Sequence, residues 1–389
     1  MTRQLNKDNS SIYSVLRAKD WRYSFLPFVA GCLYLFMVLF DLTFEKKTLL
    51  FLLSFLISAI GFASTGYLIN EFFDIESDTK AEKVNSLSKV SKQRLLLLFT
   101  LSLTVLFIPW IWLPSDPISW ILIFSEIALL LSYSLPLTRL KNVYWISGVI
   151  DSLYAYVIPL LLVTYSCSIF SGKSTDTFIV FFLLSMFFFG FRNILIHQSR
   201  DIDYDIKAGI MTLPQKLGEK KTNFYLMFAM ILEIIFFCFF CVLLSIEHSV
   251  FFFWLIVFAG IIVLSFFTKK TKIKEENLSD ESKYTFTDKA YQLWFPLFNL
   301  LIIVYHDWRW LLILPLHIFL FIPRFRLEVI YFLAENIFVK LKTGYHFVVL
   351  HFFSRPINYL IYYFFRLFNV DLRKKNMSAC SFLLTFLNK

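Results

Sequence analysis

Two short acidic segments hold the residues of this chain whose types and spacing could do chemistry. The first places Asn70, Asp74 and Asp78 four residues apart, directly after a long apolar run. Each step of four residues turns a helix only about 40° past a full turn, so these side chains share one helix face. Glu71 falls beside Asp78 on that face. The segment predicts a row of oxygen ligands at a helix end.

The second acidic segment repeats this spacing with His197, Asp201 and Asp205, again directly after an apolar run. Asp203 points to the opposite side of the same expected helix, so we expect it to take little part. Oxygen ligands with room for water and phosphate suit Mg²⁺, which would also relieve the repulsion between clustered carboxylates. One such segment alone would indicate ordinary solvated loop acids. Two matched copies favour a metal-bridged diphosphate site.

The composition places these segments in a membrane protein. Of the 389 residues, 58% are hydrophobic and 17% are charged. Soluble domains are about 45–50% apolar and roughly 25% charged. The net charge of +10 comes from bases in short clusters between apolar runs, which indicates topology signals rather than nucleic-acid binding. The CxxC formed by Cys238 and Cys241 lies inside a phenylalanine-rich apolar run, where it is typical of small helix residues.

Apolar runs long enough to span a bilayer occur at about 23–44, 49–69, 95–113, 117–135, 144–165, 177–197, 224–246, 249–268 and 291–323. Unbroken runs of this length exclude alternating barrel strands. The sequence therefore predicts an all-α polytopic membrane helical bundle of about nine transmembrane helices. The last run is interrupted at His306-Asp307-Trp308-Arg309, so it is either one long tilted span or a hairpin of two short ones.

The loops between these runs alternate in charge. The basic loops are 70–94, 136–143, 198–223 and 269–276, and the intervening loops are nearly uncharged apart from Lys46 and Lys47. The positive-inside rule places the N-terminus and both acidic segments in the cytoplasm, and we expect a multi-pass protein of the cell membrane. The first apolar run has no small-residue cleavage site after it, which favours a retained span over a signal peptide.

The C-terminal segment, 324–389, is aromatic and basic. Its charges recur too often for clean spans, and the pattern is typical of helices that lie in the membrane interface and contact lipid. We therefore expect two parts: a transmembrane domain at 1–323 and an interfacial tail at 324–389.

The two acidic segments resemble the motifs of the UbiA superfamily of intramembrane prenyltransferases. The first family motif, NDxxDxxxD, is matched at Asn70, Asp74 and Asp78, with Glu71 in place of the usual Asp. The second, DxxxD followed by Gly and Thr-Leu-Pro, is matched at Asp201, Asp205, Gly209 and 212–214. The resemblance covers about residues 15–323. The family's basic segment with two prolines after the first motif is replaced here by 83–87.

The resemblance implies Mg²⁺-dependent transfer of an isoprenyl group from an isoprenyl diphosphate to a lipophilic acceptor. That acceptor would be an aromatic quinone precursor, a tetrapyrrole or a glycerol-type lipid. The implied metal ligands are Asn70, Glu71, Asp74, Asp78, Asp201 and Asp205. All of them except Glu71 are also the expected catalytic residues. The longer side chain of Glu71 puts its direct metal contact in question.

Family members often carry a Tyr and a basic residue after the fourth span, and Tyr133 matches the first. In the strict YxxxK form the lysine position holds Leu137, so Arg139 or Lys141 must serve instead. A basic side chain here would neutralise the leaving diphosphate. For either residue alone, a plain positive-inside loop is the alternative.

Four ionisable residues lie at membrane depth: Glu126, Asp151, Arg192 and Glu233. Each should face the bundle interior or a cavity. Arg192 either reaches the substrate or pairs with a buried acid. His197 either contacts the substrate or only caps its helix.

Two other classes of function stay open at this point. A transporter would carry its acids near the membrane midplane and show related halves, whereas the strongest acids here lie at helix ends. An inactive homologue is the second alternative, since three positions, Glu71, Ser86 and Leu137, depart from the family pattern.

The charge pattern makes a direct prediction about topology. Single cysteines placed in loops 79–94 and 206–221, in a background without the five native cysteines, should react with an impermeant thiol reagent from the cytoplasmic side. A cysteine in loop 171–176 should react only from the opposite side. Labelling of both loop classes from one side would contradict the predicted order of spans.

Overall fold

The computed structural model describes residues 12–322, with the exception of 175, 257 and 261–285. All the regular secondary structure in these ranges is helical. The chain divides into two units, Met1–Leu314 and Pro315–Lys389, and the contacts described below lie within the first. The expected interfacial tail at 324–389 lies outside the described residues.

Seven helical segments of the described ranges are long and apolar enough to cross a membrane. They are Ala18–Leu39, Lys46–Lys80, Lys92–Ile111, Pro117–Ser134, Tyr144–Ser171, Ile179–Arg200 and Leu213–Glu247. The predicted all-α membrane bundle is thus confirmed. The count of nine stays a prediction, because the expected span at 249–268 runs into residues that are not described.

These segments are built from the following elements: α2 (Ala18–Arg22), α3 (Phe25–Leu39), α4 (Lys46–Lys80), α5 (Lys92–Phe107), η1 (Ile108–Ile111), α6 (Pro117–Ser134), α7 (Tyr144–Ser152), η3 (Leu153–Val157), α8 (Ile158–Ser171), α9 (Ile179–Arg200) and α11 (Leu213–Glu247). Shorter elements are α1 (Ile12–Val15), η2 (Leu140–Asn142), α10 (Ile202–Ala208), η4 (Ser249–Phe251), α13 (Phe286–Lys289), η6 (Ala290–Trp294), α14 (Phe295–His306), η7 (Trp308–Leu312) and α15 (Ile313–Phe321).

The last apolar stretch is two helical segments rather than one span. Helix α14 ends at His306, and Asp307 follows in an extended conformation with φ −144° and ψ 102°. The Asp307 carboxylate then accepts a hydrogen bond from the backbone N–H of Arg309 at 3.1 Å, which caps η7. The polar interruption in the sequence is therefore a helix break.

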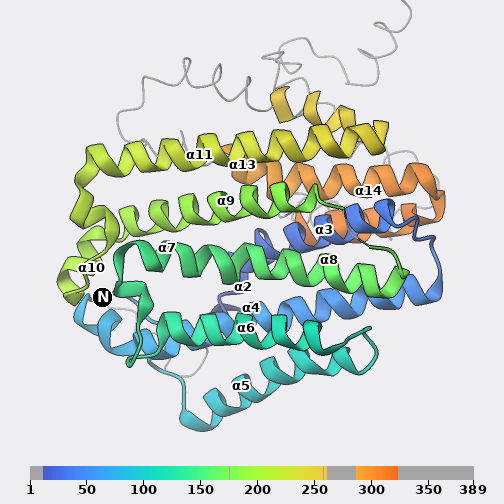
Figure 1. Cartoon of the computed structure of the whole chain (residues 1–389). Helices are drawn as coiled ribbons and strands as arrows, with labels where there is room; N and C mark the ends of the chain where they lie inside the picture. Colours follow the sequence, from blue (N-terminus) through green and yellow to red (C-terminus); the bar gives the residue numbers. More distant parts are fainter. Residues whose placement is uncertain (1–11, 175, 257, 261–285, 323–389) are drawn as a thin grey trace, which may run out of the picture. The chain divides into compact units, whose positions relative to one another are not determined.

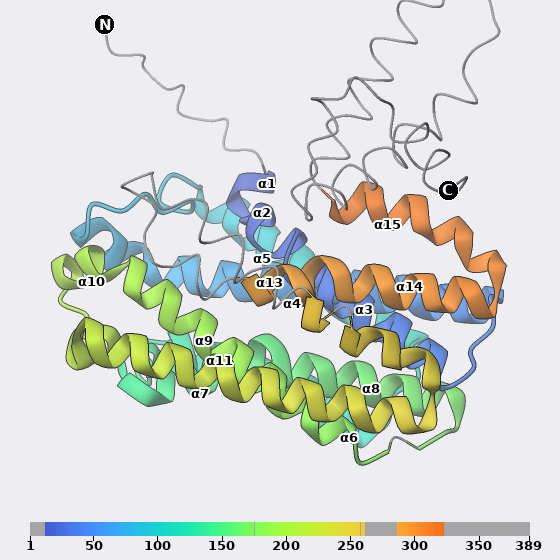
Figure 2. The ribbon, with the colours of Figure 1, turned by 90° about the horizontal axis from the view of Figure 1, so that it is seen from above.

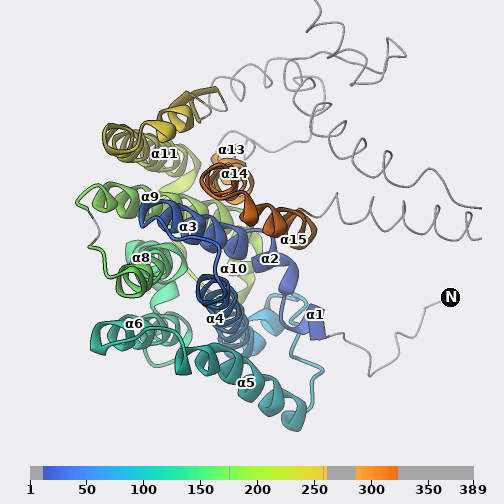
Figure 3. The same ribbon diagram turned by 90° about the vertical axis from the view of Figure 1, so that its right-hand side faces the viewer.

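The long helices of the first unit run alongside one another (Figure 1) and are seen nearly end-on in Figure 3. Helix α9 packs on α11, α4 packs on α5, and α3 packs on both α8 and α14. Small residues permit the closest approaches: a Cβ added at Gly61 of α4 would lie 2.3 Å from the backbone nitrogen of Leu106. At one end of the bundle, α10 contacts α4 (Figure 2), which brings the two acidic segments together.

A buried arginine links three helices. Arg192 of α9 donates from Nε to Glu233 of α11 at 2.8 Å and from a terminal nitrogen to Asp288 of α13 at 3.0 Å. The Arg192 and Glu233 side chains are both 0% exposed. Of the two roles considered for Arg192, the structure shows the ion pair. Arg192 is not among the residues that line the cavity described below, and its contact with substrate stays a prediction.

This ion pair predicts a large stability effect. Glu233→Ala leaves the Arg192 guanidinium buried with less compensating charge, and breaking a buried pair in this way costs about 3–5 kcal/mol. Thermal unfolding in detergent should show a clear drop in Tm. Glu247→Ala, which removes an exposed acid at the end of the same helix, is the matched control. Equal Tm values for both variants would show that the pair contributes little.

Candidate active site

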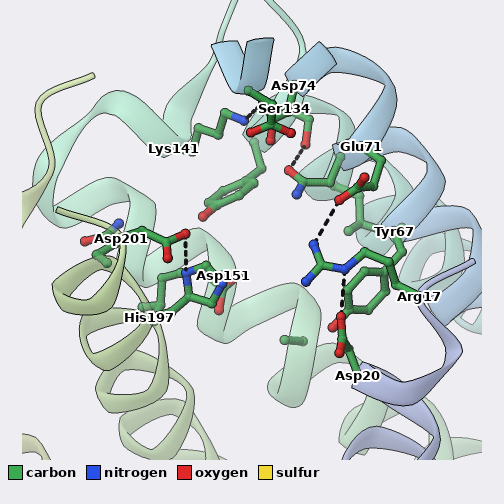
Figure 4. Close-up of a pocket in the computed structure, with 18 of the residues that line it drawn as sticks. Arg17, Asp20, Tyr67, Glu71, Asp74, Ser134, Lys141, Asp151, His197 and Asp201 are labelled. Atoms are coloured by element: carbon green, nitrogen blue, oxygen red, sulfur yellow. Dashed lines mark hydrogen bonds and ion pairs between the residues drawn. The ribbon is translucent and has the colours of Figure 1, made fainter. Parts of the chain in front are cut away.

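A cavity of about 770 Å³ lies where α4 ends and α9 passes into α10. Both acidic segments line it. From the first segment the lining residues are Asn70, Glu71, Asp74 and Asp78, and from the second they are His197, Asp201 and Asp205. Figure 4 shows Asp74 and Asp201 directed into the cavity from different helices. The two sequence segments, whose matched positions are 127 residues apart in the chain, thus form one site.

The junction of α9 and α10 preserves the four-residue repeat of the second segment. Asp201, with φ −93° and ψ 5°, ends α9 and precedes α10. Its backbone N–H donates to the His197 carbonyl at 3.2 Å, and the Asp205 N–H donates to the Asp201 carbonyl at 2.9 Å. Gly209 ends α10 with φ +70°, a conformation that favours glycine. Asp203 is exposed and does not line the cavity.

Basic side chains neutralise the central carboxylate of each segment. Asp74 forms an ion pair with Lys141, and a terminal nitrogen of Arg139 lies 3.5 Å from the same carboxylate oxygen. Asp201 accepts a hydrogen bond from Lys83 Nζ at 2.7 Å. Lys83 and Lys141 both line the cavity, whereas Arg139 contacts Asp74 but does not line the cavity. The site therefore pairs two acidic rows with two lysines that face the same space.

Asparagine and serine side chains hold the first acidic segment in place. Asn85 donates from Nδ2 to Asp78 at 2.8 Å and to the Glu71 carbonyl at 2.9 Å. Ser134, at the end of α6, donates to the Asn70 side-chain oxygen at 3.3 Å. These contacts fix the end of α4 against the loop that follows it and against α6.

Glu71 is occupied by contacts of its own. One carboxylate oxygen accepts from Arg17 at 2.9 Å, and the other accepts from both the backbone N–H and the hydroxyl of Ser86 at 3.0 Å. The Glu71 side chain is only 8% exposed. Both oxygens that a metal would need are therefore already used to join α4 to the N-terminal segment and to the loop after α4.

The surroundings of Asp205 favour the protonated form of its carboxyl group. Burial raises the pKa of Asp205 to about 6, and the neighbouring charge of Asp201 adds to the rise. Burial also lowers the pKa of Lys141, although the Asp74 carboxylate opposes this shift. Burial thus disfavours the charged forms of both side chains.

The donor set fits Mg²⁺. The cavity lining includes the carboxylates of Asp74, Asp78, Asp201 and Asp205 and the amide oxygen of Asn70, which are the hard oxygen ligands that this ion prefers. Burial and the neighbouring Asp201 charge raise the pKa of Asp205, and a bound cation would favour its ionised form. Within the described ranges, no three acidic, histidine or cysteine side chains converge on one point. The candidate ligands lie in two separate rows, and Asp74 and Asp201 are paired with lysines.

Other lining residues were only partly foreseen from the sequence. Tyr133 lines the cavity as expected, and its ring lies 5.5 Å from that of Tyr154. Arg17 and Asn85 also line or support the site but carried no motif signal, because their roles depend on contacts across the fold. His197 lines the cavity with Nδ1 3.7 Å from Asp201.

A comparison with models of protein families shows the family to which this chain belongs. The model described as the UbiA prenyltransferase family matches residues 24–295. The chain therefore belongs to the UbiA prenyltransferase family and is a multi-pass membrane prenyltransferase.

Solved structures share this fold. A UbiA homolog from Archaeoglobus fulgidus, bound to GPP and Mg²⁺, is 15% identical with a TM-score of 0.52, and the match covers 75% of this chain and 98% of that one. A UbiA homolog from Aeropyrum pernix K1 in its apo form is 14% identical with a TM-score of 0.52, over 71% and 97% of the two chains. No curated protein matches the chain.

The contacts of Glu71 predict a structural effect of its replacement. Glu71→Gln removes the charge that pairs with Arg17 and should lower the free energy of unfolding by about 1–3 kcal/mol. The Mg²⁺ concentration needed for half-maximal diphosphate release should change less than ~3-fold, since a lost direct ligand typically costs far more. Glu76→Gln, at an exposed position on the same helix, serves as control. A loss of Mg²⁺ affinity as large as that of Asp74→Asn would instead make Glu71 a ligand.

Proposed function

We propose that this chain transfers an isoprenyl group from an isoprenyl diphosphate to a lipophilic acceptor and releases diphosphate in a Mg²⁺-dependent reaction. The observation that carries this proposal is the meeting of two matched acidic rows in one cavity that also has an apolar part to its lining. The apolar lining includes Trp21, Phe25, Phe62, Ala63 and Leu130. Related structures from Archaeoglobus fulgidus that hold GPP and Mg²⁺, or DMAPP and Mg²⁺, support it.

The proposed ligands of Mg²⁺ are Asn70, Asp74, Asp78, Asp201 and Asp205. Bound Mg²⁺ would supply positive charge to the diphosphate oxygens and so favour their departure. We assign Glu71 to the support of α4 rather than to the metal, because Arg17 and Ser86 already bind both of its oxygens.

Lys83 and Lys141 are the proposed donors to the leaving diphosphate. Each now binds an acid that Mg²⁺ would neutralise, so each ammonium group would then be free to turn toward the diphosphate. Arg139 would remain paired with the Asp74 carboxylate. Positive charge that is already in place where negative charge develops lowers the barrier to bond cleavage.

The proposed reaction breaks one bond of the prenyl diphosphate and forms one bond to the acceptor. The bond between the prenyl C1 and the diphosphate oxygen breaks, and its electron pair leaves on diphosphate. The resulting allylic cation is attacked by an electron-rich atom of the acceptor, which then loses a proton to a base. The apolar part of the lining would hold the prenyl chain and keep water away from the cation. His197 and Tyr133 line this space and are proposed substrate contacts.

We further propose that the acceptor is an aromatic quinone precursor, a tetrapyrrole or a glycerol-type lipid, and that the site faces the cytoplasm at the cell membrane. The basic loops beside both acidic segments support this orientation. A charged diphosphate would then enter from the aqueous side, while its prenyl chain stays in the bundle.

Replacement of the central acids tests the function. Asp74→Asn and Asp201→Asn keep side-chain size but remove a charged ligand, and each should reduce kcat for diphosphate release at least ~10²-fold, the scale of losing one stabilising group at a developing anion. Turnover of the purified protein with Mg²⁺, prenyl diphosphates and a panel of acceptors is the measurement.

Asp203→Asn is the matched control, since Asp203 lies between two proposed ligands but is exposed and outside the cavity. It should retain turnover close to that of the unchanged protein. An essential Asp203 together with a dispensable Asp201 would overturn the proposed arrangement.

A further inference from the structure

The cavity has a second polar region besides the two acidic rows. It is formed by Glu126 and Tyr133 of α6, Asp151 of α7 and Tyr154 of η3, all of which line the cavity. The proposed Mg²⁺ and diphosphate chemistry uses neither of its carboxylates. Helix α6 packs against both α7 and η3, so these residues share one wall.

Glu126 is a buried residue of this wall with an unsatisfied carboxyl oxygen. It is 4% exposed, and its Oε2 atom has no hydrogen-bond partner. It lies eight residues before Ser134 on α6, which places it about 12 Å deeper along the helix than the contact between Ser134 and Asn70. A carboxyl group buried without a partner is costly, so its retention inside a cavity points to a ligand that completes its hydrogen bonds.

Asp151 is the second carboxyl group of this wall. Its partner is the hydroxyl of Tyr154, which donates to Oδ1 and leaves Oδ2 available. Tyr154 belongs to a π-helical turn, Leu153–Val157, that presents three successive residues, 154–156, to the cavity. Pro159 explains this turn, since it has no N–H to give the carbonyl of Ala155.

The lysines and the arginine that line the cavity form ion pairs with the two acidic rows. Arg17, Lys83 and Lys141 pair with Glu71, Asp201 and Asp74 of the two acidic rows. Among the described residues, neither Glu126 nor Asp151 forms an ion pair with a lysine or arginine. An anionic group placed against this wall would find no lysine or arginine to pair with, and an uncompensated charge is costly in a region of low dielectric. A hydroxyl group would instead donate to the available carboxyl oxygens.

We infer that the wall formed by Glu126, Tyr133, Asp151 and Tyr154 is the acceptor subsite, and that it takes a neutral acceptor through its hydroxyl groups and disfavours one that carries a carboxylate or phosphate. This inference rests on the proposed function and narrows its acceptor class. Glu126 and Asp151 act here as specificity-determining residues.

The test compares pairs of related acceptors of which one member carries an anionic group and the other does not. One pair is a hydroxybenzoate and its methyl ester, and the other is a monoacylglycerol phosphate and the monoacylglycerol itself. With the full-length protein, Mg²⁺ and a prenyl diphosphate, the neutral member of a pair should have the higher kcat/KM. Glu126→Gln and Asp151→Asn should each raise KM for the neutral member by ~10- to 100-fold, the scale of one hydrogen bond to a charged group.

The same two variants should improve use of the anionic member, so that the ratio between the two falls. Tyr154→Phe, which releases Asp151 without changing its charge, should raise KM by a smaller factor and keep the preference. Asp203→Asn is the control that alters an acid outside the cavity. Preference for the anionic member, an unchanged ratio in both carboxyl variants, or no turnover with any of the four compounds would overturn the inference.

Failure of the inference is distinguishable from failure of the proposed function. Mg²⁺-dependent binding of a prenyl thiodiphosphate, measured without acceptor, reports on the acidic rows alone. If that binding is present and the anionic acceptor is preferred, only the acceptor subsite is wrong. If that binding is absent, the proposed function fails, and the inference fails with it.

Discussion

Charge compensation at the end of an apolar bundle is the constraint on which the rest of this structure depends. Several carboxylates face one cavity, where burial and mutual repulsion are strong enough to raise the pKa of Asp205 to about 6. The chain meets this cost with lysines on loops: Lys141 on Asp74 and Lys83 on Asp201. Both kinds of charge can serve a diphosphate, the acids through a metal and the lysines directly.

The packing of the helices serves this arrangement. Contact of α10 with α4 brings the two acidic segments to one cavity, and the close approach at Gly61 lets α4 and α5 pack tightly. Arg192 binds Glu233 and Asp288, which links α9 to α11 and α13, and none of these three residues lines the cavity. A rigid frame around α9 keeps Asp201 and Asp205 at a fixed position opposite α4, which a two-sided metal site requires.

Sequence reasoning succeeded where helical periodicity decides the answer. Residues four apart share a helix face, so the placement of Asn70, Asp74 and Asp78 together, and of Asp203 away from the cavity, followed from spacing alone. Long apolar runs likewise predicted the membrane helices, because few other structures satisfy the backbone in lipid.

What sequence reasoning missed depends on contacts between distant segments. Nothing in the spacing of Arg17 and Glu71, 54 residues apart, shows that they form an ion pair. The partner of Arg192 could be described only as some buried acid, since the choice depends on how α9, α11 and α13 pack. The role of Glu126 was similarly hidden: its position at membrane depth was evident, but its unpartnered oxygen in the cavity was not.

Titration calorimetry tests the central claim most directly. An unreactive prenyl thiodiphosphate is added to the purified protein, once with Mg²⁺ and once with EDTA. Because the two acidic rows should bind the diphosphate only through the metal, binding is expected with Mg²⁺ and should be lost in EDTA. Equal binding under both conditions would contradict the account, since the lysines alone would then be sufficient to hold the substrate.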